Sequence, residues 1–229
     1  MNRKTRVLIL NSPHNPTGTV LSPQDLVELE RILKDMEVIV LSDEVYEHLV
    51  FDGRQHASVL RHEELFQRAF VVSSFGKTYH VTGWKTGYVI APPALTTELR
   101  KIHQYVSFTG VTPLQWALSD FMAAHPEHVS ELPAFYQAKR DLFCDLLAGS
   151  RFSFTRAAGT YFQLADYSAI RPDLDDVAMS EWLTRQHGVA SIPISVFYQT
   201  PPAESRLVRF CFAKREETLR QAAQRLCAI

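Results

Sequence analysis

Short apolar runs alternate with polar or amphipathic stretches along the first ninety residues of the chain. Within each run the β-branched and leucine residues follow one another directly, which is typical of strands covered on both faces in a parallel sheet. The pattern predicts strands at residues 6–10, 38–41, 69–73 and 87–91. We expect the first of them to be buried, like the others.

The segment between the first two predicted strands has the period of a helix. Ser22 and Asp25 have the spacing of a capping box, and Pro23 stands at the first helical position. One face of the helix is apolar, with Leu26, Leu29, Ile32 and Leu33. Strand, helix and strand in this order form a βαβ unit, so the predicted fold class is α/β with a mostly parallel sheet.

The second half of the chain changes character twice. Residues 92–149 have a helical pattern in which Pro133 marks a start or a kink. Beyond residue 149 the pattern is mixed, with strands predicted at 152–155, 160–164 and 207–212 and helices at 177–186 and up to residue 229. The expected organisation is a partial large domain at 1–125, a connecting helix at 126–149 and a smaller α/β domain at 150–229.

Composition narrows the class of protein. Of the 229 residues 46% are hydrophobic, and 24 basic side chains face 25 acidic ones, so the net charge of −1 favours neither a nucleic-acid nor an anionic-membrane partner. No apolar run approaches the roughly 18 residues of a membrane span. The nine histidines lack metal-ligand spacing, so no metal site is predicted. Cys144, Cys211 and Cys227 are widely spaced, which indicates buried thiols in a reducing, cytoplasmic compartment.

Three polar clusters follow the first three predicted strands, at residues 11–18, 42–46 and 73–77. Taken singly, each is compatible with a turn, a helix cap or a solvated cation. The carboxyl ends of parallel strands meet at one edge of a sheet, where ligands of open α/β sheets bind. The sequence therefore predicts a site at that edge with an amide, a carboxylate, a phenol, hydroxyls and an amine.

The amino-acid sequences of these clusters resemble those of a known family. The strings PHNPTG, SDEVY and SSFGKTYHVTGWKTGY, followed by SIPISVFY and LVRFCFAK, are similar to the class I and II aminotransferases of fold type I, which depend on pyridoxal 5′-phosphate (PLP). The similarity extends over essentially the whole chain. The resemblance looks closest to the branch that contains the methionine, kynurenine and glutamine aminotransferases.

The resemblance implies a role for each matching residue. Lys77 matches the catalytic lysine that binds PLP as a Schiff base and then moves the proton at the substrate α-carbon. Asp43 matches the carboxylate that pairs with the pyridine nitrogen. Tyr46 and Asn15 match the two donors to the 3′ oxygen of the cofactor.

Three further residues carry over in the same way. Ser74 and Lys85 match ligands of the cofactor phosphate, although many relatives have arginine where this chain has Lys85. Arg209 matches the clamp for the substrate α-carboxylate, a task suited to a bidentate donor. Its neighbours Val208 and Phe210 are apolar, so alternation alone is equally compatible with an edge-strand arginine that faces water.

The resemblance also implies missing parts. Before its NPTG motif the family has an N-terminal arm, a glycine turn that holds the phosphate and an aromatic residue that stacks on the pyridine ring. We therefore expect this chain to be the C-terminal part of a longer enzyme that is a homodimer in its full-length form.

Three functional hypotheses follow. The first is an aminotransferase that transfers the amino group of methionine, an aromatic amino acid, kynurenine or glutamine to a 2-oxo acid. The second is a cysteine-conjugate β-lyase that uses the same lysine, aspartate and arginine, and the third is a catalytically inactive C-terminal fragment. Tyr161, Phe162 and Phe197 fit an apolar substrate pocket, but aromatic residues on strands are also common in cores.

Overall fold

The computed structural model describes residues 4–229, and the chain divides into two compact units. The first comprises the residues up to Pro13 together with Val20–Pro133, and the second comprises His14–Thr19 together with Ala134–Ile229. The short segment His14–Thr19 thus belongs to the second unit, although it lies within the range expected for the large domain. The expected domain boundaries themselves stay a prediction.

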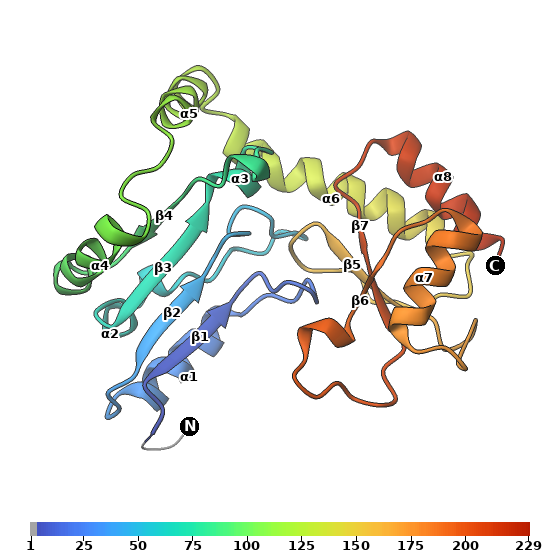
Figure 1. The fold of residues 1–229 in the computed structure, drawn as a ribbon, viewed down its shortest axis with the longest axis horizontal. Helices are drawn as coiled ribbons and strands as arrows, with labels where there is room; N and C mark the ends of the chain where they lie inside the picture. The colour runs from blue at the N-terminus through green and yellow to red at the C-terminus, as the bar shows by residue number, and fades with distance from the viewer. Residues whose placement is uncertain (1–3) are drawn as a thin grey trace. The chain divides into compact units, whose positions relative to one another are not determined.

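The first unit contains a four-stranded sheet with the order β1-β2-β3-β4 (Figure 1). The pairs β1–β2 and β2–β3 are parallel, and β4 runs antiparallel to β3, so the prediction of a mostly parallel sheet is confirmed. All four predicted strands are present, as β1 (Val7–Asn11), β2 (Ile39–Asp43), β3 (Ala69–Ser74) and β4 (Gly87–Ile90).

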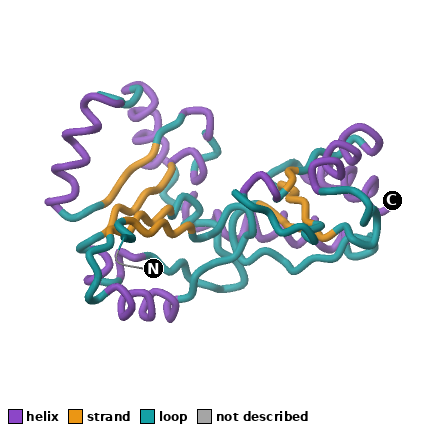
Figure 2. Tube along the Cα trace, turned by 60° about the horizontal axis from the view of Figure 1, so that its bottom comes forward, coloured by secondary structure: helices purple, strands orange, loops and turns teal. Residues whose placement is uncertain are grey.

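Helix α1 (Pro23–Leu33) begins as its sequence predicts. The Ser22 hydroxyl accepts a hydrogen bond from the backbone N–H of Asp25, and the Asp25 carboxylate accepts one from the N–H of Ser22. The helix packs on one face of the sheet, and Figure 2 shows it on the side opposite to α4. Leu26 and Leu33 are buried in a core that they share with Val40 and Val71 of the strands.

The remaining helices of the first unit confirm the helical pattern of residues 92–149. They include α4 (Pro93–Val106), α5 (Thr112–Ala124) and the start of α6 (His128–Leu147). Pro133 lies inside α6 and not at its start. Shorter helices join the strands, namely η1 (Val59–Arg61), α2 (Glu63–Phe66), α3 (Phe75–Thr78) and η2 (Thr82–Trp84).

Two details of the strand prediction are wrong. Strand β1 is not buried on both faces: Val7 and Ile9 share one face and are 53% and 66% exposed, whereas Leu8 and Leu10 on the other face pack against the core. Residues 152–155 do not form a strand; Ser153 makes only an isolated bridge with Asp166. For β1 the apolar run correctly indicated a strand but not which of its faces is covered. For residues 152–155 the apolar run indicated only an extended chain.

The second unit is built on a small antiparallel sheet with the order β5-β7-β6. Its strands are β5 (Phe162–Asp166), β6 (Ile192–Pro193) and β7 (Leu207–Cys211), and its helices are α7 (Asp176–His187), η3 (Ser195–Phe197), α8 (Glu216–Cys227) and the later turns of α6. The two longer strands and both predicted helices are confirmed, whereas the two-residue β6 has no sequence signal. Among the cysteines Cys144 is buried but Cys227 is exposed, so the expectation of buried thiols is wrong for Cys227.

No helix among residues 4–229 is long and apolar enough to cross a membrane.

The turn His14–Thr19 is anchored inside the second unit at Gly18. The Gly18 carbonyl accepts hydrogen bonds from the N–H groups of Ala158 and Gly159. Gly18 has φ +70°, and a Cβ placed there would lie 2.6 Å from the Cβ of Ala157. A side chain at this position therefore meets both backbone strain and a steric clash.

We expect Gly18→Ala to lower the free energy of unfolding by at least about 2 kcal/mol, the sum of a left-handed backbone cost and an overpacking cost. Gly53→Ala is the matched control, because Gly53 has φ +69° with no atom within 4 Å of the added Cβ. The control should lose only about 1 kcal/mol. Chemical denaturation monitored by circular dichroism measures both, and equal losses would show that the contact with Ala157 is unimportant.

Candidate active site

The carboxyl end of β2 holds Asp43 in place through its backbone. Asp43 lies opposite Asn11 in the parallel register, and its carbonyl accepts hydrogen bonds from the Ser12 N–H at 3.1 Å and from the Asn11 side-chain amide at 3.2 Å. The Asp43 carboxylate in turn accepts the N–H of Val45 at 3.3 Å. These bonds fix the direction in which the carboxylate leaves the strand end.

Burial raises the pKa of Asp43 above its ordinary value. The Val45 N–H and the positive charge of Lys77 oppose this rise, and the negative charge of the adjacent Glu44 adds to it. Asp43 is thus a half-buried acid within electrostatic reach of Lys77, poised to share a proton with a basic partner.

Lys77 lies on α3, the four-residue helix that follows β3 directly. Its Nζ is 5.7 Å from the centroid of the Tyr46 ring, and Tyr46 is 2% exposed. Ser74 ends β3 and precedes the first residue of α3. Gly76 is necessary between them, since a Cβ there would lie 2.9 Å from the Cα of Thr82 and 3.3 Å from the Ser74 hydroxyl.

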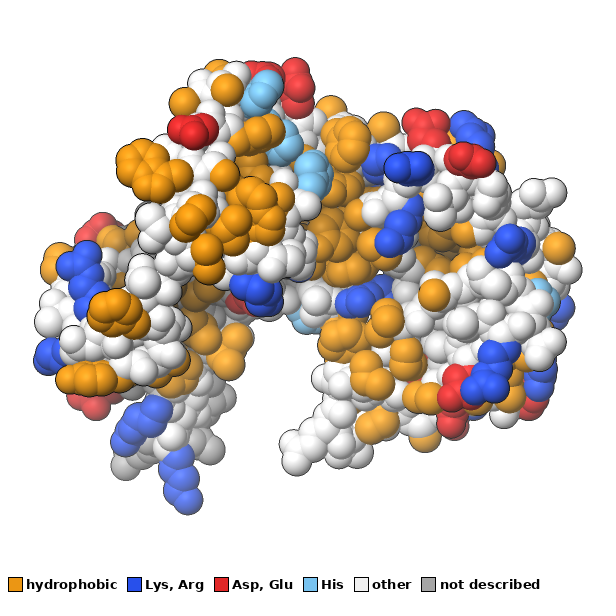
Figure 3. Space-filling model, turned by 45° about the horizontal axis from the view of Figure 1, so that its top comes forward, with side chains coloured by type: hydrophobic (Ala, Val, Ile, Leu, Met, Phe, Trp, Pro, Cys, Tyr) orange, Lys and Arg blue, Asp and Glu red, His pale blue; other side chains and the backbone are white. Residues whose placement is uncertain are grey.

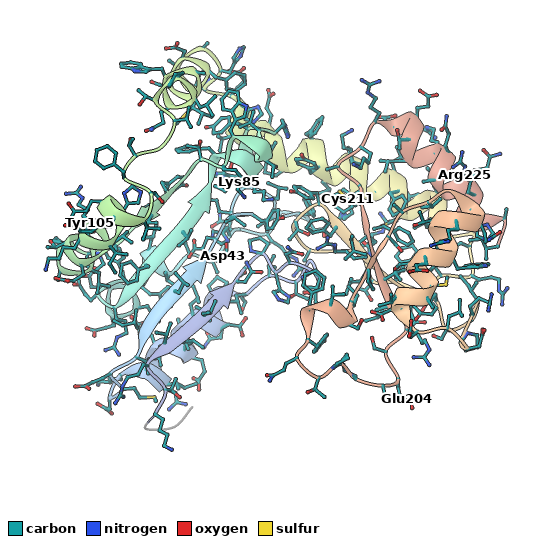
Figure 4. The ribbon with its side chains drawn as sticks, viewed as in Figure 1. Asp43, Lys85, Tyr105, Glu204, Cys211 and Arg225 are labelled. Carbon is teal, nitrogen blue, oxygen red and sulfur yellow. The ribbon has the colours of Figure 1, made fainter. Side chains whose placement is uncertain are left out.

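The first unit thus brings Asp43, Tyr46, Ser74 and Lys77 to the carboxyl ends of two neighbouring strands. Lys85 follows η2 with φ +54° and is exposed. Figure 4 labels Asp43 at the end of β2 and Lys85 beside the loop that leads into β4.

The other two predicted site residues, Asn15 and Arg209, lie in the second unit and contact each other. The guanidinium Nη1 of Arg209 donates to the side-chain oxygen of Asn15. Arg209 is the middle residue of β7, the central strand of its sheet, and its flanks Val208 and Phe210 are buried. The edge-strand interpretation of Arg209 is therefore wrong.

Aromatic rings surround the Arg209 guanidinium. Its central carbon lies 3.9 Å from the centroid of the Phe162 ring and 5.3 Å from that of Phe197. Such rings attract the cation and keep its planar donors oriented. Phe162 is buried, whereas Phe197 is 44% exposed beside Val196, which is 62% exposed.

Comparison with protein families gives a match over nearly the whole chain. Residues 1–226 match the family described as aminotransferase class I and II. The chain belongs to the class I and II aminotransferase family. Members of this family use PLP, and their substrates are amino acids and 2-oxo acids.

Individual relatives agree with the branch that the sequence indicates. The methionine aminotransferase of Escherichia coli is 51% identical over 226 residues, which are 99% of this chain and 58% of that protein. Human kynurenine–oxoglutarate transaminase 3 is 34% identical, over 97% of this chain and 53% of that protein. The chain thus spans between half and three fifths of the length of these curated relatives.

A solved structure from Escherichia coli, of a protein with a methionine aminotransferase function, has the same fold. It superimposes with a TM-score of 0.96 at 50% identity, covering all of this chain and 60% of the solved one. The predicted fold class, the partial large domain of a PLP-dependent transferase with a smaller α/β domain, is thereby confirmed.

Sequence reasoning missed Glu44 as a structural support of the candidate site. Glu44 is 1% exposed, and its carboxylate accepts hydrogen bonds from the Ser42 hydroxyl at 2.9 Å and the Val59 N–H at 3.2 Å and pairs with His56 Nε2 at 2.7 Å. Burial alone would raise the pKa of Glu44, but its hydrogen bonds with His56, Ser58 and Ser42 outweigh burial and lower it. The residue after Asp43 is thus tied to a distant loop.

Glu47 was missed in the same way. Its carboxylate accepts hydrogen bonds from the Ser73 hydroxyl of β3 and the Tyr88 phenol of β4, a directly opposed pair on these strands. Burial and the bond with Glu47 raise the pKa of Tyr88 to about 12, so the phenol keeps its proton at neutral pH. The loop that follows Asp43 and carries Tyr46 is therefore anchored by two glutamates.

Replacing Asp43 by asparagine should raise the denaturation midpoint at neutral pH. The folded pKa of Asp43 lies above the unfolded value of about 3.9, so the wild type loses stability as pH rises from there through the folded pKa. The advantage of Asp43→Asn should therefore shrink as the pH is lowered towards the unfolded value. Urea denaturation at a series of pH values measures this advantage.

Asp25→Asn is a control for which the denaturation midpoint at neutral pH should change in the opposite direction. Hydrogen bonds with Ser22 lower the pKa of Asp25, so its ionised form stabilises the fold above the unfolded pKa and the substitution should lower the midpoint at neutral pH. A loss of stability from Asp43→Asn at neutral pH would contradict the direction inferred for Asp43.

Proposed function

We propose that the whole protein transfers the amino group of an L-amino acid to a 2-oxo acid with PLP as cofactor. The observation that carries the proposal is the meeting of Lys77, Asp43 and Tyr46 at the carboxyl ends of β2 and the β3–α3 junction, in a chain of the aminotransferase family. The proposed PLP-binding part is 1–125, with a connecting helix at 126–149 and a small domain at 150–229.

The side chains of the first unit suit PLP. The ring nitrogen of PLP is a base, which matches the half-buried Asp43, and its phenolic oxygen matches a hydroxyl donor such as Tyr46. Ser74 and the N–H groups at the start of α3 suit a phosphate, and Lys85 adds a positive charge. Gly76 allows the backbone of Thr82 and the Ser74 hydroxyl to approach α3 closely, which a side chain would prevent. When bound, PLP supplies a carbonyl for attachment of an amino group and a ring that withdraws electrons from the substrate α-carbon.

In this proposal Lys77 has two tasks. Its neutral amine would hold the cofactor at the carbonyl that PLP supplies, and the free amine would carry the proton of the substrate α-carbon. Asp43 would pair as a carboxylate with the pyridine nitrogen and so would keep that nitrogen protonated and the ring electron-poor. Tyr46 donates its phenolic hydrogen to the cofactor oxygen and also forms an apolar wall for the Lys77 amine.

Arg209 is proposed to bind the substrate α-carboxylate, and Asn15 to donate to the cofactor oxygen. The hydrogen bond between them supports this pairing, because it leaves the Asn15 oxygen occupied and directs its amide hydrogens elsewhere. A guanidinium held by rings and an amide offers two parallel N–H donors, as a carboxylate requires.

The surroundings of Arg209 indicate the class of substrate. The rings of Phe162 and Phe197 place apolar surface beside the guanidinium, which favours methionine, an aromatic amino acid or kynurenine over an acidic one. The Escherichia coli and human relatives with methionine and kynurenine activity support this choice. Glutamine is retained as the fourth candidate.

We also propose that the full-length protein is a cytoplasmic homodimer. Helices α4 and α5 and the loop between them expose large apolar side chains that a second subunit would cover, and Figure 4 shows Tyr105 projecting from α4. Tyr105, Val106, Phe108 and Trp116 are between 67% and 86% exposed. Free thiols at Cys144, Cys211 and Cys227 support a reducing compartment.

Addition of PLP to the chain should give a visible absorption band that methionine bleaches. Lys77→Ala should abolish the band, because no other amine in this proposal reaches the cofactor carbonyl. Lys101→Ala is the control, since Lys101 is exposed on α4 and paired with Glu98. A folded wild type without the band would contradict binding of PLP by this chain, and an unchanged band in Lys77→Ala would contradict the role of Lys77.

The products distinguish amino transfer from the β-lyase reaction. Formation of a new amino acid from an added 2-oxo acid supports amino transfer, whereas release of pyruvate and a thiol from a cysteine conjugate, without 2-oxo-acid-dependent turnover, would identify a β-lyase.

Arg209→Lys should raise KM for the amino acid by roughly ten- to a hundredfold, since a charge-assisted hydrogen bond contributes about 1.5–3 kcal/mol. The affinity for PLP should stay nearly unchanged. Arg220→Lys, at an exposed position of α8 near Glu216, provides the control. Titration of PLP followed by steady-state kinetics separates the two effects, and equal weakening of PLP and amino acid would show that Arg209 is not the clamp.

A further inference from the structure

We infer that His128 is a positioning residue for Lys77, holding the short helix that carries the amine. The inference rests on the proposed function only in naming Lys77 as the reactive group. Its structural basis is a hydrogen bond between His128 and the carbonyl of Thr78, the residue that follows Lys77.

Helix α3 needs an external partner at its end. It contains only Phe75–Thr78, so few of its backbone groups find partners within the helix, and Tyr79 N–H donates to the Phe75 carbonyl at 2.8 Å. His128, at the first position of α6, places Nε2 2.7 Å from the Thr78 carbonyl oxygen. Figure 1 shows α3 beside the start of α6.

The direction of this bond follows from its acceptor. A carbonyl oxygen can only accept, so Nε2 of His128 carries the hydrogen. Both the imidazolium and the neutral form with hydrogen on Nε2 can donate, so the bond does not depend on protonation of the ring. The positive form would also interact favourably with the carbonyl end of the helix.

Aromatic packing holds the imidazole in place. The His128 ring stacks on Tyr79 with centroids 5.1 Å apart and an interplanar angle of 19°. Phe121 and His80 contact it edge-on, with centroids 5.4 and 5.5 Å away. Figure 3 shows histidine side chains gathered beside apolar ones on this face of the first unit. With three rings around it, His128 has one orientation in which to meet Thr78.

The hydrogen bond between His128 and Thr78 affects the position of the Lys77 amine. Loss of one hydrogen bond matters more in a four-residue helix than in a long one, because few other bonds keep the backbone of residues 75–78 in register. Lys77 reaches the Tyr46 ring and the field of Asp43 only while that backbone is held. His128 therefore acts on the amine through Thr78, without contact with a substrate.

Two substitutions separate the bond from the ring packing. His128→Phe keeps a flat ring against Tyr79 but removes the donor, and His128→Gln keeps an N–H donor but removes the ring. His125→Phe is the matched control, because the His125 side chain is 51% exposed, and its ring packs on the same Phe121 with centroids 4.7 Å apart.

The first measurement uses the chain without cofactor. It records hydrogen exchange of the backbone amides of residues 75–79 in each variant. It also records the rate and the pH midpoint of acylation of Lys77, with Lys101 as the internal reference. His128→Phe should exchange about tenfold faster, as expected for loss of one hydrogen bond, and should shift the Lys77 midpoint. His128→Gln and His125→Phe should stay within about twofold of wild type. Faster exchange without any change at Lys77 would show a merely structural role and overturn the inference.

A measurement on the wild type alone covers the case in which His128→Phe does not fold. Nitrogen NMR of His128 should show hydrogen on Nε2 in the neutral ring, and hydrogen on Nδ1 would overturn the inference. Addition of PLP distinguishes the two proposals. A wild type that shows the acylation pattern but no visible band contradicts binding of PLP by this chain and leaves the positioning role standing. A band whose pH midpoint is equal in wild type and His128→Phe disproves the positioning role only.

Discussion

The parallel pairing of β2 with both of its neighbours is the constraint on which the candidate site depends. It brings Asn11, Asp43 and Ser74 to the same edge of one sheet, where the strands end and their last backbone groups need partners. The Asp43 carbonyl meets this need with Ser12 and Asn11, and the Glu44 N–H donates to the Val72 carbonyl at 2.8 Å. The carboxylates of Glu44 and Glu47 then bind side chains around the same strand ends. The hydrogen bonds that satisfy these buried polar groups therefore also set the positions of Asp43 and Tyr46 in the candidate site.

Local signals in the sequence were sufficient for most of the fold. The capping box at Ser22 and Asp25 involves residues three apart, so the start of α1 could be predicted without knowledge of the rest of the chain. The predicted strands of the first unit are also correct. The exposure of β1 could not be predicted, because Val7 and Ile9 lie on the exposed face of the strand while Leu8 and Leu10 pack on the core, and all four residues are equally apolar.

The candidate site was predictable in its residue types and only partly in its contacts. Alternation around Arg209 showed that its side chain faces away from Val208 and Phe210, but not that its strand is central. The family resemblance supplied the roles that spacing alone left open, and these remain proposals. Glu44 with His56 and Thr78 with His128 depend on partners 12 and 50 residues away, for which the sequence has no local signal.

The hydrogen bond between Asn15 and Arg209 joins positions 194 residues apart, and both lie in the second unit. During synthesis at the ribosome the turn that contains Asn15 emerges first, and it must wait for β7 before its partner exists. The first unit has no such delay at Lys77, because Thr78 and His128 are only 50 residues apart. Contacts that are close in sequence form earlier and at lower entropic cost. The contact that holds the backbone beside Lys77 is therefore available within the first unit before the partner of Asn15 in the second unit has been synthesised.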